Sequence, residues 1–412
     1  MTRSTSSRRR LARAGAALAA SAAVVLALPA AAAAQIVFVR DHAIWAMSDD
    51  GGDQHQVLSP DEVGTPGWKL ADPDVLPGGT TFAFAGTWGQ VRTTGGPIGA
   101  CGSFCTGTYV WSAGQVRRLS EAPAMLPFLE SSDAGPHWTA DGRVTSRFEV
   151  YAWETTLVAP FWRFTGFAGA DRVTAADGSA RTTLGDLGGA CRNGDTLGVQ
   201  ALDSAVVPDP AAAGRYLYVP CADGGFFDLV VADGTGGGAI TIGRDDLSPL
   251  DPAFSPDGAY VIDVEDGAPA EEDGLWRYRN APLAPGGNVQ VLRAPSGVVS
   301  SPAFAGTRIV FAAQGDIWSI PRGCGDGGTP CAFPGDATRL TSGSAADEDP
   351  AWTSSSTRIA PPAAAAPPST PAPAPATTTP APSTSPTPTP IPAPAADRTA
   401  PVVRTGSIAV AR

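Results

Sequence analysis

The chain contains the stretch Asp251-Pro252-Ala253-Phe254-Ser255-Pro256-Asp257-Gly258, followed directly by the run Tyr260-Val261-Ile262. Proline at the second position of a tight turn presets φ, and the glycine supplies the positive φ that the chain reversal needs. The apolar residues on both sides of the turn are strand formers. The stretch therefore predicts two short antiparallel strands joined by a Ser-Pro-Asp-Gly turn.

The same hairpin pattern recurs in weaker form in five other places. The weaker copies lie at 72–84, 135–144, 204–219, 301–311 and 349–360. A second pattern follows each hairpin: a short β-run, a polar glycine turn and a strand that ends on Leu or Ile, as in Asp316-Ile317-Trp318-Ser319-Ile320 and the later Arg339-Leu340. Repeated units of four short strands are typical of the blades of a β-propeller.

These repeats resemble those of a known family. The Pro-x-Trp/Phe-Ser-Pro-Asp-Gly hairpin, the Asp-Ile-Trp-x-Ile strand and the Arg-Leu-Thr ending are similar to the TolB-type (WD40-like, PD40-type) propeller repeat across residues 36–360. The resemblance implies an all-β, six-bladed propeller with four-stranded blades. Residues 36–39 fit a second strand and residues 349–360 a first strand, so we expect the C-terminal strand to join the first blade and close the ring. TolB proteins carry an α/β domain before the propeller. Here strand residues begin at Ile36, two residues after the predicted cleavage site of an export signal, so the resemblance implies the fold and not the TolB role.

The segments outside the propeller have distinctive compositions. Residues 1–34 have an arginine-rich start, an apolar run from 14 to 28 and an Ala-Ala-Ala end, which predicts a signal peptide of either the ordinary secretory or the twin-arginine type. No later apolar run is as long, so we expect a protein that is not integral to a membrane. We assign residues 35–360 to the propeller and residues 361–396 to a disordered Pro/Ala/Thr/Ser-rich linker or stalk. Residues 397–412 are expected to be a short unfolded C-terminal segment.

Six cysteines in an exported chain predict disulfide bonds. The cysteines fall into three neighbouring pairs, and the sequence alone leaves their connectivity open. They are Cys101 and Cys105, Cys191 and Cys221, and Cys324 and Cys331. No Cys-x-x-Cys pattern supports a metal site. We therefore expect an extracellular, periplasmic or cell-envelope-associated protein.

The charge of the chain limits its partners. The formal net charge is −12, and all five charges before residue 35 are arginines, so 23 basic and 40 acidic residues remain after cleavage, a net charge of −17. Such a charge argues against nucleic acid as a partner. We expect a monomer that binds a protein or peptide, which could be basic, or an envelope component.

The candidate binding residues lie where the innermost strand of each blade approaches the propeller axis. The positions before the repeated proline, or equivalent to it, are Asp72, Gly135, Ser204, Asp251, Ser301 and Asp349. Asp72, Asp251 and Asp349 would form an acidic channel mouth suited to a cation or a basic peptide, with His137 close by. The alternative is that an aspartate before proline only caps the turn into its strand.

The sequence predicts no catalytic residues, because it lacks a Gly-x-Ser-x-Gly elbow and a phosphate-binding glycine loop. We therefore expect a non-enzymatic protein- or ligand-binding scaffold without a cofactor. The alternative is a metal-dependent channel-site hydrolase or lactonase that holds a divalent cation such as calcium. A further acidic cluster between 263 and 273 is expected to be a solvated loop, and the aromatic residues between 151 and 167 are expected to pack in the core.

Overall fold

The computed structural model of the chain describes ten stretches of backbone. They are residues 34–63, 68–88, 106–120, 129–155, 162–185, 206–219, 229–242, 248–266, 271–281 and 287–361. The chain divides into two units, residues 1–363 and 364–412, and every described residue belongs to the first. The predicted signal peptide, apart from Ala34, and the tail beyond residue 361 lie outside the described residues.

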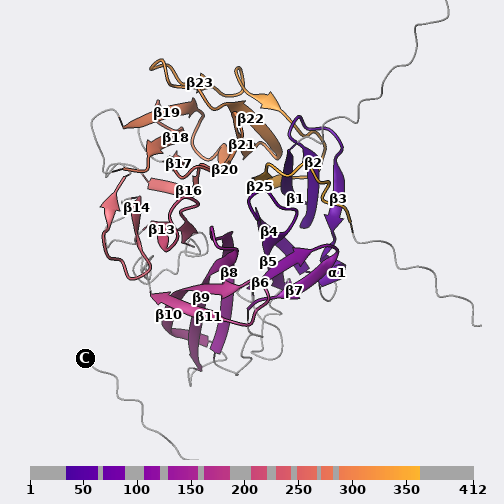
Figure 1. The fold of residues 1–412 in the computed structure, drawn as a ribbon, viewed down its shortest axis with the longest axis vertical. Helices are drawn as coiled ribbons and strands as arrows, with labels where there is room; N and C mark the ends of the chain where they lie inside the picture. Colours follow the sequence, from indigo (N-terminus) through magenta and orange to yellow (C-terminus); the bar gives the residue numbers. More distant parts are fainter. Residues whose placement is uncertain are drawn as a thin grey trace, which may run out of the picture. The chain divides into compact units, whose positions relative to one another are not determined.

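The strands in these stretches form six sheets, which follow one another around a ring (Figure 1). Blade one contains β25 (Asp347–Thr353), β1 (Gln35–Arg40), β2 (Ala43–Ser48) and β3 (His55–Leu58). Blade two contains β4 (Trp68–Val75), β5 (Phe82–Trp88), β6 (Thr106–Ser112) and β7 (Gln115–Arg118). Blade three contains β8 (Leu129–Trp138), β9 (Arg143–Thr155), β10 (Trp162–Ala175) and β11 (Arg181–Gly185). Blade four contains β12 (Val207–Pro208), β13 (Arg215–Tyr218), β14 (Val230–Asp233) and β15 (Ile240–Thr241). Blade five contains β16 (Ser248–Phe254), β17 (Tyr260–Asp266), β18 (Gly274–Arg279) and β19 (Asn288–Arg293). Blade six contains β20 (Val299–Ala305), β21 (Arg308–Ala313), β22 (Asp316–Pro321) and β24 (Thr338–Arg339). One short helix, α1 (Pro60–Val63), connects blades one and two in the described part of the chain. The predicted six-bladed all-β propeller is confirmed.

The Ser-Pro-Asp-Gly turn between β16 and β17 has the local structure that its residues predict. The backbone N–H of Ser255 donates to the carbonyl of Tyr260 at 2.8 Å, and the Ser255 hydroxyl donates to Asp257 at 2.6 Å. Gly258 has a φ of +65°, which a side chain rarely permits. A Cβ atom at Gly258 would also lie 2.6 Å from the Cβ of Ala211, so the turn is pressed against blade four.

The ring closes as expected, because β25 pairs with β1 in the first blade. Their register places Ile36 opposite Trp352 and Val37 opposite Ala351. The chain beyond β25 stays attached: the Gln35 amide oxygen accepts a hydrogen bond from the N–H of Ile359 at 2.9 Å. Because the ring is closed, each blade has a neighbouring blade on both sides.

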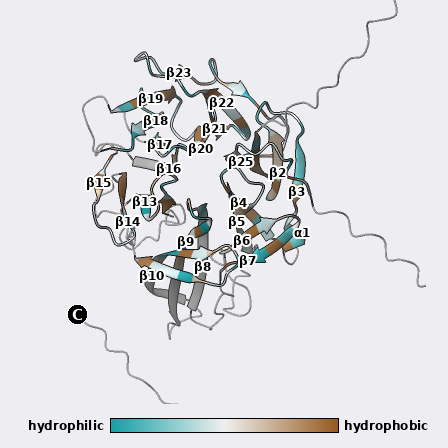
Figure 2. Cartoon of the chain, viewed as in Figure 1, coloured by the Kyte–Doolittle hydropathy of each residue, from teal (hydrophilic) through white to brown (hydrophobic). Residues whose placement is uncertain are grey.

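The core lies between adjacent blades, so both faces of each sheet are buried. On the face of blade two that packs against blade one, the ring of Phe82 stacks on Trp111 with centroids 4.9 Å apart, and Phe84 stacks on Tyr109 at 5.4 Å. Figure 2 shows the difference along the sheets: the outermost strand β7 is largely hydrophilic, whereas β14 is largely apolar. Blade-to-blade packing of this kind fixes the strands that reach the axis.

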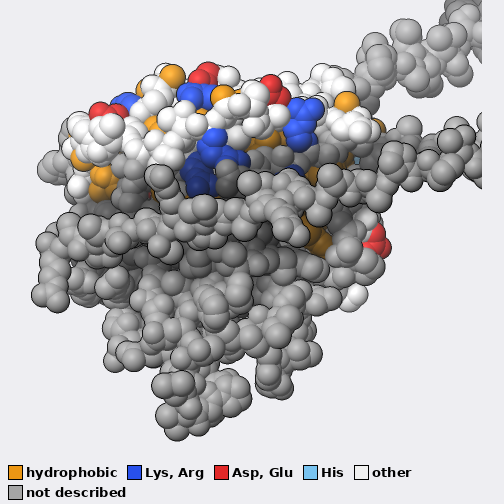
Figure 3. Space-filling view, turned by 90° about the horizontal axis from the view of Figure 1, so that it is seen from below, with side chains coloured by type: hydrophobic (Ala, Val, Ile, Leu, Met, Phe, Trp, Pro, Cys, Tyr) orange, Lys and Arg blue, Asp and Glu red, His pale blue; other side chains and the backbone are white. Residues whose placement is uncertain are grey.

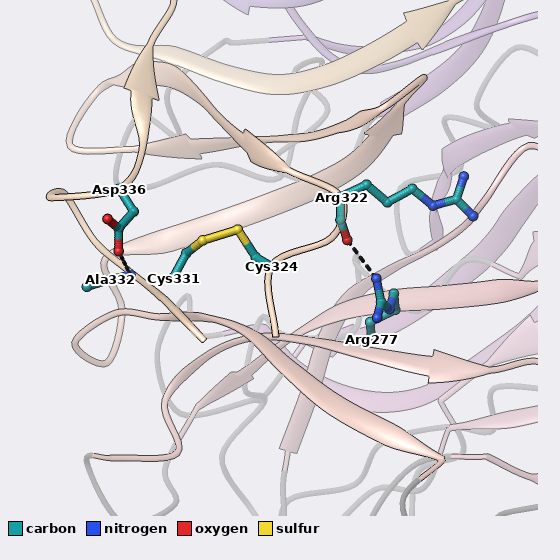
Figure 4. The surroundings of a disulfide bond; sticks show 6 residues. All are labelled: Arg277, Arg322, Cys324, Cys331, Ala332 and Asp336. Atoms are coloured by element: carbon teal, nitrogen blue, oxygen red, sulfur yellow. Dashed lines mark hydrogen bonds between the residues drawn. A yellow bond between two sulfur atoms is a disulfide. The ribbon is translucent and has the colours of Figure 1, made fainter. Parts of the chain in front are cut away.

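Blade six contributes one strand to blade five. After β22 the chain crosses over, and β23 (Cys331–Ala332) pairs in parallel with β19, with Leu292 opposite Cys331. A disulfide between Cys324 and Cys331 closes this crossing loop, and Arg277 of β18 donates to the carbonyl of Arg322 at its base (Figure 4). Cys101, Cys105, Cys191 and Cys221 lie outside the described residues.

Two other expectations meet the structure differently. The expectation of a solvated acidic loop between 263 and 273 is wrong for its strand residues: Asp263 is 0% exposed and Glu265 1% exposed, because β17 has a neighbouring blade on both faces. Of the aromatic residues between 151 and 167, Phe161 lies outside the described residues. The others belong to a long hairpin of β9 and β10, but nothing is described of their side chains. In the described stretches, no helix combines the length and hydropathy that a membrane crossing would take.

Candidate functional site

The innermost strands of five blades share a backbone irregularity at the residue pair that ends in proline. At this pair the register with the second strand shifts, which marks a β-bulge. The first residue of each pair has a φ between 48° and 60°, in the left-handed region. These residues are Asp72, Gly135, Asp251, Ser301 and Asp349. Bulges redirect side chains, and here they occur where the strands meet the axis.

A cavity of about 290 Å³ lies among these bulges. Residues from all six blades line it, and its wall combines prolines, large apolar side chains and aspartates. The apolar lining includes Val75, Pro77, Trp138, Val207, Pro208, Phe254, Pro256, Phe304 and Trp352. The charged or titratable lining residues are Asp72, Asp74, Asp251, Asp349 and His137. No lysine or arginine is among the described residues of the wall.

The structure brings the predicted site residues together. Asp72, Asp251, Asp349 and His137 all line this one cavity. Ser204, the equivalent position assigned to blade four, lies outside the described residues. The binding role of these side chains stays a prediction.

A chain of hydrogen bonds joins the axial aspartates across four blades. The N–H of Ser301 donates to Oδ2 of Asp251 at 2.9 Å, and its hydroxyl donates to Oδ1 of Asp349, also at 2.9 Å. The N–H of Asp72 donates to Oδ2 of Asp349 at 3.3 Å. Asp251 and Asp349 therefore each accept a hydrogen bond from a backbone N–H of the next blade.

Burial raises the pKa of Asp251 and of Asp349 above the usual range of an aspartic acid. The hydrogen bonds from Ser301 act in the opposite direction at both carboxyls, and the charge of Asp349 raises the pKa of Asp251 further. Both side chains are half-buried in the cavity wall. The pair is thus short of positive charge, and a proton or a cation would stabilise it.

Asp74 is a site residue that the sequence analysis missed. Its Oδ2 accepts a hydrogen bond from the N–H of Trp138 at 2.7 Å and lies 3.6 Å from Nδ1 of His137. Trp138 also donates its indole N–H to the Asp74 carbonyl at 3.0 Å. The signal was present in Asp72-Pro73-Asp74, because a bulge at the first two residues places the third at the same axial end.

The metal prediction finds no further support in the side chains that the structure describes. Among those residues, no three His, Cys, Asp or Glu side chains are grouped so that they could hold a metal ion. The divalent cation stays a prediction attached to the alternative function. The face drawn in Figure 3 carries basic, acidic and scattered apolar side chains, and in the described part of the chain Leu250, 40% exposed, is the one exposed large apolar residue.

No family model matches the sequence, and no curated protein matches it. The chain is similar in fold to TolB from Acinetobacter baumannii, with a TM-score of 0.47 and 12% identity, over 77% of this chain and 66% of that one. It is also similar to a chain of the nidogen/laminin complex, with a TM-score of 0.46 and 11% identity over 78% and 97% of the two chains. A third similar structure is hydrazine synthase of Kuenenia stuttgartiensis, with a TM-score of 0.44 and 12% identity over 78% and 46%. The chain spans just under two thirds of the TolB chain, and the likeness concerns the fold alone.

Proposed function

We propose that the protein is an exported, non-enzymatic binding scaffold whose axial cavity takes up a positively charged segment of a partner protein. The observation that carries this function is the composition of the cavity wall: four aspartates and one histidine among prolines and aromatic rings, with no lysine or arginine among its described residues. Apolar surface with a few converging polar groups is typical of binding sites. Carboxylates in a concave, low-dielectric wall concentrate positive charge.

The proposed location outside the cytoplasm agrees with two independent features of the chain. Residues 1–34 have the composition of an export signal. The Cys324–Cys331 disulfide is of a kind that persists in oxidising compartments. Secretion or attachment to the cell envelope would place the cavity where exported partners occur.

Site-specific photocrosslinking in the producing cells tests this function. A photoreactive amino acid at Pro77, an exposed residue of the cavity rim, should crosslink to one exported partner protein. The same amino acid at Gln56, exposed on the outermost strand β3, should not capture that partner. Replacement of Asp72, Asp251 and Asp349 by Asn in the Pro77 variant should abolish the crosslink. An undiminished crosslink in that variant, or equal capture from both positions, would contradict uptake of the partner by the acidic cavity.

A further inference from the structure

The two most closely linked carboxyls of the cavity meet at one serine. Ser301, at the bulge of β20, donates its N–H to Asp251 of β16 and its hydroxyl to Asp349 of β25, each at 2.9 Å. Both donors of this residue are therefore used on carboxylate oxygens of the two neighbouring blades. The bridge places the two acids close together, and the charge of one acts on the other.

Among the described lining residues, the remaining groups around this pair include no lysine or arginine. β4 contributes Asp72 and Asp74, and β8 contributes His137, whose imidazole faces Asp74 at 3.6 Å. The described lining from blade four consists of Val207, Pro208 and Pro210. Two half-buried carboxyls with this surrounding cannot both hold a charge without cost, because a nearby like charge and a low dielectric both disfavour the ionised form.

The pair therefore has two ways to reach a favourable charge state. In the empty cavity the pair keeps a proton to a higher pH than a solvated aspartic acid does, because burial raises the pKa of both Asp251 and Asp349. With a cation in the cavity, the ionised pair is stabilised instead. Building on the proposed function, we infer that uptake of a basic side chain, an ammonium or a guanidinium group, displaces a proton from the Asp251–Asp349 pair into solvent. The bound group arrives already protonated, so the exchange leaves the charge of the cavity balanced and makes the affinity depend on pH.

The sign of the pH dependence follows from this exchange. Below the pH at which the pair loses its proton, binding of the cation must release one, and the affinity rises by up to about tenfold per pH unit. Above that range the pair is already ionised, and the affinity levels off. A neutral side chain of the same size would displace no proton.

Calorimetry with the full chain tests the exchange. The probes are the tripeptide Ala-Lys-Ala, acetylated and amidated at its ends, and the same peptide with norleucine in place of lysine. We expect the lysine peptide to bind more tightly, and its heat to differ between phosphate and Bis-Tris buffers, both at pH 6, by the amount that proton release into each buffer requires. Its affinity should rise between pH 4 and pH 7.

The outcomes separate the two levels of the inference. A lysine peptide that binds with equal heat in both buffers overturns the proton exchange and leaves the proposed function intact. A lysine peptide that does not bind, or binds no more tightly than the norleucine peptide, overturns the exchange and also the preference for a basic segment. The photocrosslinking experiment addresses the proposed function without reference to protons.

A matched pair of variants locates the exchange. Asp349→Asn should lower the affinity for the lysine peptide at least about tenfold and remove the buffer dependence, because one carboxyl of the pair is lost. Glu348→Gln removes an equal charge from the adjacent residue, which is exposed and does not line the cavity, and should bind as the unmodified chain does. An equal effect of both substitutions would overturn the assignment to the pair. Wild-type calorimetry decides the exchange itself even if Asp349→Asn does not fold.

Discussion

Two aspartates six residues apart in blade five occupy opposite environments. Asp257 lies exposed in the turn between β16 and β17, where it accepts hydrogen bonds from the Ser255 hydroxyl at 2.6 Å and the Ala259 N–H at 3.2 Å. Asp251 lies at the bulge of β16, half-buried in the cavity wall, and accepts from Ser301 of the next blade. The local hydrogen bonds, that of Ser255 above all, lower the pKa of Asp257, whereas burial raises the pKa of Asp251.

The contrast shows that one repeat separates local structure from the contacts between blades. The turn aspartate stabilises its own hairpin, and the axial aspartate joins two blades at the expense of its own solvation. A third acid extends the series: Asp263 lies two residues after Val261, on the strand face that packs against blade four. Burial and the charge of Glu265 raise the pKa of Asp263 well above its usual value. We therefore expect the effect of replacing each of these aspartates to increase with the burial of its carboxyl group.

The largest effect is expected from Asp263→Asn. Because the folded state raises the pKa of this carboxyl, its contribution to stability is fully present below the unfolded pKa and is lost as the pH rises through the folded value. The neutral amide removes this loss, so the variant should be more stable than the unmodified chain by about 2 kcal/mol at pH 7 and nearly equal to it at pH 3. Urea unfolding at both values measures the difference.

The control for this substitution is Glu271→Gln, which removes the charge of an exposed acid from the same segment. It should change stability little at either pH. If Asp263→Asn gives no gain in stability at pH 7, or an equal gain at pH 3, then ionisation of the buried Asp263 carboxyl does not destabilise the fold.

The sequence could not reveal these buried acids, because Val261-Ile262-Asp263-Val264-Glu265 alternates like a strand with one solvated face. That rule holds for a sheet with one side in water. In a propeller, each sheet packs between two others, so polar residues of the pattern enter an interface. Asp72, Asp251 and Asp349 were found from the prolines that follow them, whereas Asp74 is followed by Val75 and was missed for that reason.

A smaller effect of the same sign is expected at the axis from Asp251→Asn. The pKa of Asp251 is raised, so its contribution is also present at low pH and lost as the pH rises. The amide oxygen can still accept the hydrogen bond of Ser301. The stability of the variant, measured relative to the unmodified chain, should therefore be about 1 kcal/mol higher at pH 7 than at pH 3. Thermal unfolding across this range measures the gain. A loss of stability at pH 7 would show instead that the ionised carboxylate holds blades five and six together.

The hairpins and the closing strand were predictable, because turn residues and β-branched runs are local signals. Ser255-Pro256-Asp257-Gly258 specifies its own turn, and the two chain ends of the propeller each supply part of one blade. The addition of β23 to blade five was not predictable. Its two residues, Cys331 and Ala332, carry no pairing pattern, and a parallel pair across blades depends on tertiary contacts alone.

The smallest effect, with the opposite sign, is expected from Asp257→Ala. The pKa of this exposed carboxyl is lowered in the fold, so its stabilisation is present above the unfolded pKa and is lost as the pH falls through the folded value. Solvent screening limits the cost at pH 7 to about 0.5 kcal/mol, and the difference should shrink toward pH 2, where the carboxyl is protonated in both states. Denaturant titrations at pH 7 and pH 2 compare the two chains. A variant whose loss grows as the pH falls would contradict this, since the turn would then depend on the protonated acid and the distinction from Asp251 would disappear.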